Sequence, residues 1–306
     1  MKKIIIPVLL IYLSLFMPSE VFALSTTEAK EEIDINRKSS LTINYNNDLT
    51  DTEVKLYKIA SVSKDFQYQL STDFSVYPIN INGITSDLDW NILDNTINSY
   101  IVADGIEAFK TYFINDNFLK IENLEVGLYF VKMEKIDKDD YVLIFDNFLL
   151  SVPNLGEDGY WDYDVSIYPK VESYIPKYEK IDYTVIKQWR DDKVNRPKSV
   201  DIDIYKDGVL VDSQVLSTSN NFTYSFETLD DGSEWSVVER NILEGYNVSI
   251  LNKNRNFIII NTDTHYEEDN PKTLDDIKIY LYLLIGTFIG IILLVVSLFL
   301  NIKRGE

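Results

Sequence analysis

Cysteine is absent from the 306 residues of this chain, and histidine occurs once. A chain without cysteine cannot be stiffened by disulfides. The single histidine, His265, lies in the polar segment NTDTHYEEDNPKT, where we expect it to be solvated. The sequence also has no Gly-rich phosphate loop, no Ser/His/Asp set and no EF-hand spacing. We therefore expect no metal site, no cofactor and no enzymatic activity.

Positive charge is also scarce, because 29 Lys and Arg residues stand against 49 Asp and Glu residues, and the net charge is −20. A chain this acidic is a poor partner for nucleic acid or for an anionic membrane surface. Acidic surfaces of this kind mostly promote solubility.

Long apolar runs occur at the two ends of the chain. Residues 1–23, MKKIIIPVLLIYLSLFMPSEVFA, have the lysines, short apolar run and small final residue of a signal peptide cleaved after Ala23. The alternative is an uncleaved start-transfer anchor. The uncharged run IYLYLLIGTFIGIILLVVSLFL reaches the roughly 20 residues of a membrane span. We place a transmembrane helix at 277–302 and a cytoplasmic tail at 303–306, so the chain between the two runs is expected outside the membrane.

Between Ser39 and Val171 most segments alternate apolar and polar residues, which predicts β-strands. These segments are SLTINYN, DTEVKLYKIASV, LKIENLEVGLYFVKMEK, DNFLLSVP and WDYDVSIYP. The segment TSDLDWNILDNTINSYIVADG instead predicts a helix that starts after Thr85 or Ser86 and ends at Gly105. Its helical spacing rests on Leu88, Ile92, Thr96 and Tyr100.

A second β region follows between Ile181 and Thr264. Its seven short alternating segments, separated by turn residues, are typical of an immunoglobulin-like sandwich. The predicted fold is mainly β, with two tandem immunoglobulin-like β-sandwiches, a helical insertion in the first, and a C-terminal transmembrane helix. The predicted parts are the signal peptide at 1–23, an N-terminal segment at 24–38, a first domain at 39–172, a linker at 173–180, a second domain at 181–264, a second linker at 265–276, and the membrane helix and tail.

Three strands of the second region each carry one polar residue on an apolar face. Alternation places Lys187, Glu239 and Asn261 in rows of aromatic and aliphatic residues. A lone buried Lys or Glu is costly, so these side chains either meet or avoid burial, with Lys187 snorkelling out and Glu239 on the rim. If they meet, burial favours a neutral amine and a protonated carboxyl. The amine can then attack the Asn261 amide while Glu239 passes a proton to the departing ammonia.

The same segments resemble a known family. YTVIKQWRDD, RPKSVDIDIYKDG, NFTYSFETLDDG, EWSVVERNILEGYNVS and FIIINT are similar to the collagen-adhesin Cna B-type repeat, over almost all of residues 183–262. The family has a lysine, a glutamate and an asparagine at the positions of Lys187, Glu239 and Asn261. The resemblance implies a spontaneous Lys187–Asn261 isopeptide bond, promoted by Glu239, in place of disulfides.

The first β region offers no such set. SLTINYN has Asn44 and Tyr45 where a lysine would be needed, and Glu134 in GLYFVKMEK can be mistaken for the acid. We therefore predict no isopeptide bond in the first domain, with Lys55 and Lys58 on the next strand left open as donors.

The linker before the membrane run contains DNPKTLDD. Pro-Lys-Thr followed by an apolar span and basic residues resembles the sorting signal of Gram-positive surface proteins, in which a sortase cysteine attacks after the threonine, here Thr273. This LPxTG-like motif comprises Asn270, Pro271, Lys272 and Thr273. Asn270 and Leu274 depart from the commonest Leu and Gly, which leaves the sortase class open. The alternative is an ordinary single-pass anchor.

The first region resembles the N-terminal domain of SpaA-like, sortase-assembled pilins. WDYDVSIYPK matches the pilin motif at Trp161, Val165, Ile167, Tyr168, Pro169 and Lys170. In that family the motif lysine takes the threonyl group of the next subunit. Alternation puts Lys170 on the polar face, so we expect its amine to be exposed, and Pro169 suits a strand terminus.

Together these patterns predict an exported, cell-wall-anchored, pilin-like structural subunit of a Gram-positive bacterium. The expected partners are sortase, other pilin subunits, peptidoglycan and, before processing, the membrane. The alternative is a monomeric wall-anchored adhesin or stalk protein built from the same domains, for which a host surface ligand stays open.

Overall fold

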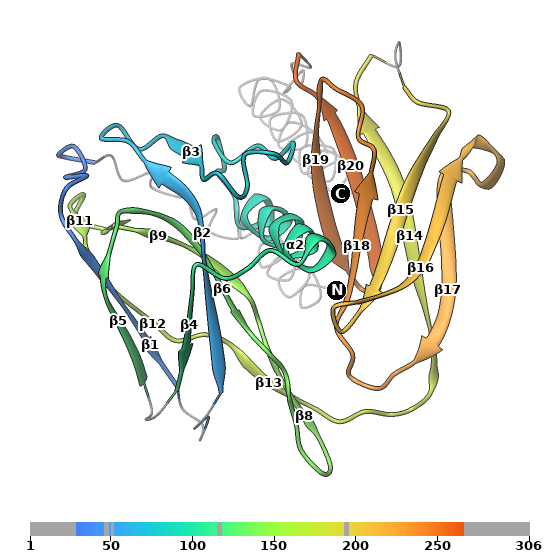
Figure 1. Ribbon diagram of the computed structural model, residues 1–306, viewed down its shortest axis with the longest axis horizontal. Helices are drawn as coiled ribbons and strands as arrows, with labels where there is room; N and C mark the ends of the chain where they lie inside the picture. The colour runs from blue at the N-terminus through green and yellow to red at the C-terminus, as the bar shows by residue number, and fades with distance from the viewer. Residues whose placement is uncertain (1–28, 46–48, 50–51, 115–117, 193–195, 266–306) are drawn as a thin grey trace, which may run out of the picture. The chain divides into compact units, whose positions relative to one another are not determined.

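The computed structural model describes residues 29–45, 49, 52–114, 118–192 and 196–265. β-Strands dominate these residues, so the mainly β class is confirmed (Figure 1). The predicted signal peptide, membrane helix and tail, at 1–23, 277–302 and 303–306, lie outside the described residues. Among the helices that are described, none has the length and apolar character needed to cross a membrane.

The first domain contains three small sheets and a two-stranded ribbon. The sheet orders are β3-β2-β6-β9 with β4 on β2, β12-β1-β5, and β13-β8-β7, and the ribbon is β10-β11. The strands are β1 Ser39–Asn44, β2 Glu53–Val62, β3 Tyr68–Leu70, β4 Lys110–Phe113, β5 Phe118–Leu124, β6 Gly127–Met133, β7 Ile136–Asp137, β8 Val142–Phe145, β9 Phe148–Val152, β10 Asn154–Leu155, β11 Trp161–Asp162, β12 Asp164–Ile167 and β13 Val171–Tyr174.

Strand β6 lies at the centre of this domain and is buried on both faces. Tyr129 and Val131 face the sheet that contains β1, whereas Leu128 and Phe130 face the helix α2, Asp87–Asp104. The sequence pattern treats residues 119–135 as one alternating run, but the structure divides it into β5 and β6, which belong to different sheets. Because helix α2 covers the face of β6 that would otherwise be exposed, buried and exposed residues do not alternate along this strand.

Helix α2 forms where the sequence predicts it. Ser86 is the N-cap and forms a capping box with Asp89, and Gly105 ends the helix in the left-handed region at φ 60°. The expected stripe is buried only in part, because Thr96 and Tyr100 are buried whereas the Leu88 side chain is 54% exposed. The apolar residues that enter the core are Leu93, Ile97, Tyr100 and Ile101.

The second domain has the seven strands that the pattern predicts, in two facing sheets. One sheet has the order β17-β14-β20-β19 and the other β16-β15-β18. The first and last strands, β14 and β20, pair in parallel. The bounds are β14 Lys180–Arg190, β15 Ser199–Lys206, β16 Val209–Ser217, β17 Thr223–Leu229, β18 Trp235–Arg240, β19 Tyr246–Lys253 and β20 Asn256–Asp263, with a short 3₁₀ helix η1 at Thr218–Asn220.

The helix α2 also connects the two domains. Tyr205 and Val238 of the second domain belong to the same apolar cluster as Ile97 of α2. The Thr96 hydroxyl accepts a 2.8 Å hydrogen bond from the backbone N–H of Ile250 on β19. The described residues up to Thr262 therefore form one compact unit. Strand β13 also extends to Tyr174, into the segment predicted as a linker at 173–180.

The orientation of α2 can be tested with a matched pair of substitutions. Ile97→Ala should lower the free energy of unfolding by about 2–5 kcal/mol, because it leaves a cavity in a closed core. Leu88→Ala should change it by about 0.5 kcal/mol or less, since that side chain is mostly solvated. Urea titrations of both variants measure the difference, and a larger loss for Leu88→Ala would contradict the observed orientation.

Candidate functional site

Lys187, Glu239 and Asn261 lie together between the two sheets of the second domain. Lys187 and Asn261 come from the paired strands β14 and β20, and Glu239 comes from β18 of the facing sheet. Register pairs Lys187 with Ile259, so Asn261 is its diagonal neighbour on the same face. All three are buried, with relative exposures of 4%, 2% and 1% in the order named above. Neither Lys187 nor Glu239 therefore sits at a solvated rim.

Glu239 contacts both of the other side chains. Asn261 Nδ2 donates a 2.9 Å hydrogen bond to Glu239 Oε1, and Lys187 Nζ lies 3.4 Å from Glu239 Oε2. Lys187 Nζ also donates to the backbone carbonyl of Gln188 at 2.7 Å and stands 4.6 Å from the ring centroid of Trp189. The carboxyl is thus placed between the amine and the amide.

Burial shifts the protonation of both ionisable groups toward their neutral forms. Desolvation lowers the pKa of Lys187 to about 8, although the nearby Glu239 opposes this shift. Desolvation also raises the pKa of Glu239, against the opposing effect of Lys187 and Asn261. A neutral amine and a protonated carboxyl are the forms that amide chemistry requires.

Two oxygens of this set are buried without a hydrogen-bond partner among the described residues: Oε2 of Glu239 and Oδ1 of Asn261. An unsatisfied buried oxygen typically costs about 1–3 kcal/mol. One proton on Glu239 Oε2, shared with Asn261 Oδ1, would satisfy both atoms. That proton would also polarise the amide carbonyl for attack by an amine.

Lys170 lies between β12 and β13, and its side chain is 64% exposed. It forms ion pairs with Glu172 and, at 3.6 Å, with Asp146. The hydrogen bond with Glu172 and the charge of Asp146 raise the pKa of Lys170. Its amine is therefore open to a partner but held protonated, and it becomes a nucleophile only after a proton is removed.

The other residues of the predicted pilin motif divide between core and surface. Trp161 and Val165 are buried, whereas Tyr168 is 70% exposed and Pro169 is half-buried. Trp161 Nε1 donates a 2.8 Å hydrogen bond to the backbone carbonyl of Glu31. The motif thus also holds the segment before β1 in place. That segment has no periodic pattern of apolar residues, so its sequence does not predict this contact.

The remaining first-domain candidates form contacts within that domain, at its surface for the charged residues and in its core for Tyr45. Lys55 Nζ pairs with Glu134 at 2.7 Å, and Lys58 Nζ pairs with Glu125 at 2.5 Å. Asn44 Nδ2 donates a 2.9 Å hydrogen bond to Ser166 Oγ. Tyr45 is buried, with its hydroxyl 3.5 Å from Met133 Sδ.

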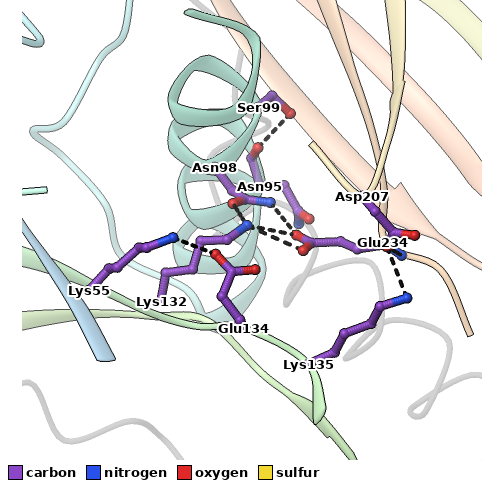
Figure 2. A network of polar contacts seen from close by, with 9 residues as sticks. All are labelled: Lys55, Asn95, Asn98, Ser99, Lys132, Glu134, Lys135, Asp207 and Glu234. Atoms are coloured by element: carbon purple, nitrogen blue, oxygen red, sulfur yellow. Dashed lines mark hydrogen bonds and ion pairs between the residues drawn. The ribbon is translucent and has the colours of Figure 1, made fainter. Parts of the chain in front are cut away.

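Sequence reasoning missed a buried polar network at the contact between the domains. Lys132 on β6 is 5% exposed and touches Asn98 of α2 and Glu234, which precedes β18 (Figure 2). A signal was present, because Lys132 shares a strand face with Leu128 and Phe130 in GLYFVKM. The partners come from distant segments, which a single-strand pattern cannot identify.

Several predicted positions lie outside the described residues. They are the signal cleavage residue Ala23 and the sorting-signal residues Asn270, Pro271, Lys272 and Thr273. His265 is described, and its side chain is 91% exposed.

The seven-stranded sandwich with an internal Lys/Glu/Asn set defines an immunoglobulin-like module of the Cna type. Residues 183–262 match the family model of the Cna protein B-type domain. The match covers almost the whole second domain, which is therefore similar to a Cna B-type domain, as its sequence motifs predict. A comparison with curated proteins returns no significant match.

Similar solved structures include surface proteins of Gram-positive bacteria. A single B repeat unit of the collagen-binding surface protein Cna of Staphylococcus aureus is 15% identical, with 74% of this chain and 98% of that chain covered and a TM-score of 0.26. The major pilin SpaD of Corynebacterium diphtheriae is 16% identical, with 76% and 65% covered and a TM-score of 0.31. The major pilin SpaA of the same organism is 13% identical, with 71% and 63% covered and a TM-score of 0.27. Likeness at this level does not extend to function.

The lowered pKa of Lys187 predicts a pH dependence in a variant that keeps its free amine. In Asn261→Ala, the unfolded chain binds more protons than the folded one between about pH 8 and the ordinary lysine pKa of 10.5. Stability should therefore rise with pH across this window. Urea titrations at pH 8, 9 and 10, compared with Asn261→Ala/Lys187→Met, isolate the effect. Equal slopes in the two variants would show that Lys187 is not desolvated.

Proposed function

We propose that this chain is a pilin-like structural subunit of a Gram-positive cell surface, stiffened by an isopeptide bond between Lys187 and Asn261. The observation that carries the proposal is the buried set of Lys187, Glu239 and Asn261 on the first, last and facing strands of one domain. A charged pair in an apolar core is a poor source of stability by itself. An amide bond between Lys187 and Asn261 would replace the buried charge of the amine with a neutral group and so remove that cost. Bond formation therefore explains why these residues are buried together.

The reaction needs no added reagent. Neutral Lys187 Nζ attacks Cγ of Asn261, whose carbonyl is polarised by the proton on Glu239. The C–Nδ2 bond then breaks, Nδ2 leaves as ammonia with protons supplied through Glu239, and Glu239 ends in its starting state. Glu239 is already hydrogen-bonded to the leaving nitrogen at 2.9 Å. The chain acts once on itself and is otherwise non-enzymatic.

The position of the bond suits a protein that carries tension. The chain enters the second domain on β14 and leaves it on β20, and these two strands are direct neighbours. A covalent link between them would carry a pulling force past the other five strands. The domain would then stay folded under loads that break hydrogen bonds, as a subunit of a surface fibre requires.

Attachment and assembly are proposed from the tail motif and Lys170. A sortase would cleave after Thr273 and pass the threonyl group to peptidoglycan or to the motif lysine of another subunit. Lys170 fits the role of acceptor because its amine is exposed, while Glu172 and Asp146 hold it protonated until a partner displaces them. The expected partners are thus sortase, other pilin subunits and the wall.

The internal bond predicts a mass change that is confined to one site. Wild type should yield a cross-linked peptide containing Lys187 and Asn261, lighter than the sum of its parts by one ammonia. Glu239→Gln should retain both residues unlinked and lose about 4 kcal/mol of stability, the order expected for a cross-link that closes a long loop. Peptide mapping and thermal denaturation measure both quantities. An unlinked Lys187 in the folded wild type would disprove the bond.

Polymerisation predicts a dependence on one surface lysine. Lys170→Ala should abolish high-mass ladders in cell-wall extracts, because the acceptor amine is gone. Lys180→Ala is the matched control, since the Lys180 side chain is 73% exposed, against 64% for Lys170, and also pairs with a glutamate, Glu227. Ladders that persist in Lys170→Ala would reject this acceptor, and a wild type without ladders would favour the monomeric adhesin.

A further inference from the structure

The network between the domains contains the same three residue types as the site in the second domain. Lys132 Nζ lies 3.1 and 3.2 Å from the two carboxyl oxygens of Glu234. Asn98 Nδ2 donates a 2.9 Å hydrogen bond to Glu234 Oε1. Lys132 Nζ also donates a 3.0 Å hydrogen bond to Asn98 Oδ1. Each member of this lysine, glutamate and asparagine set therefore touches both others (Figure 2).

We propose that Lys132 and Asn98 form a second isopeptide bond, which ties helix α2 to strand β6, and that Glu234 of the second domain promotes it. The two residues to be joined lie outside the segment 183–262 that holds Lys187 and Asn261, whereas Glu234 lies within it. The proposed bond replaces our expectation that the first domain has none. The inference does not depend on the proposed function, because either bond can form without the other.

The geometry of the two sets agrees closely. In each, the asparagine Nδ2 donates to the glutamate Oε1 at 2.9 Å. The lysine Nζ lies within 3.4 Å of the carboxyl in both cases. In the set of Lys132, Glu234 and Asn98, the amine is also within hydrogen-bond distance of Asn98 Oδ1, the oxygen bonded to the carbon that it would attack. Proximity of this kind makes a slow amide exchange feasible within a folded chain.

The surroundings explain why a lysine at this position needs a partner. Lys132 belongs to β6, all seven residues of which are buried. The Asn98 side chain is also buried, between the helix and the strand. An ion pair would need only the carboxylate, whereas here the carboxamide also contacts both groups, with Oδ1 toward the amine and Nδ2 toward the acid. That is the arrangement in which the nucleophile and the proton donor meet the same amide.

A second carboxyl near the set can supply protons. Asp94 lies one helical turn before Asn98 on α2, and both line a cavity of about 450 Å³ that Glu234 also borders. The Asp94 Oδ1 atom is buried without a hydrogen-bond partner among the described residues. Burial and the charge of Asp146 raise the pKa of Asp94 to about 7, so part of it is protonated at neutral pH. The cavity offers ammonia a route out.

The step balances within the chain. Lys132 Nζ forms a bond to Cγ of Asn98, the bond from Cγ to Nδ2 breaks, and Nδ2 leaves as ammonia. Starting from the neutral amine, Nζ gives up one proton to Glu234 as the new bond forms, and Glu234 returns one proton to the leaving nitrogen, so no oxidant or other reagent is required. The Glu234 side chain is 42% exposed, compared with 2% for Glu239. Water therefore competes for Glu234, and the second bond should form more slowly than the first.

Peptide mapping of the full-length folded protein tests the proposal directly. Wild type should lose two molecules of ammonia, one in a peptide pair containing Lys187 and Asn261 and one in a pair containing Lys132 and Asn98. Glu234→Gln should lack only the cross-link between Lys132 and Asn98, and Glu239→Gln should lack only the cross-link between Lys187 and Asn261. Failure of the function proposed above would remove the Lys187 pair and leave the Lys132 pair, so the two outcomes are distinguishable.

A neighbouring ion pair provides the control. Lys135 Nζ pairs with Asp207 Oδ1 at 3.2 Å across the same contact between the domains. The same oxygen accepts a 2.9 Å hydrogen bond from the backbone N–H of Glu234, so this ion pair adjoins the set through main chain only. Lys135→Gln should weaken the contact between the domains while both cross-links still form. If Lys132 is recovered unlinked from folded wild type after prolonged incubation, or if Lys135→Gln abolishes the bond as fully as Glu234→Gln does, the assignment is wrong.

Discussion

Desolvation of lysine amines is the constraint on which the interior of this protein depends. Lys187 and Lys132 both lie on strand faces that otherwise pack apolar side chains, and each belongs to a set with a carboxyl and a carboxamide. A protonated amine in such a place is tolerated only with partners of good geometry. The elements that meet at each lysine are therefore held in place by a polar requirement as well as by apolar burial.

Strand β6, which carries Lys132, is buried on both faces. One face of the strand contributes to the core against β1, and the other contributes to the core against α2. The apolar cluster around α2 continues through Tyr205 and Val238 into the second domain. The helix is therefore shared by the two domains, and the sandwich of the second domain is attached to the first domain by packed side chains in addition to the connecting chain.

Much of this arrangement could be predicted from local patterns. Period-two alternation located the seven strands of the second domain and placed Lys187, Glu239 and Asn261 on inward faces. Capping residues located α2, because Ser86 and Gly105 act through contacts within a few residues. What local patterns missed depends on distant partners. The exposure of Leu88, the division of residues 119–135 between two sheets, and the meeting of Lys132 with Glu234 are decided by which layer covers which face.

The parallel pairing of β14 and β20 has a consequence for length. Since the first and last strands run in the same direction, the chain enters the domain at one pole and leaves it at the other. Strand β14 has 11 residues, which at the rise of a β-strand is about 35 Å. The domain thus separates the chain segments before and after it by nearly its full length, so it can act as a spacer between them.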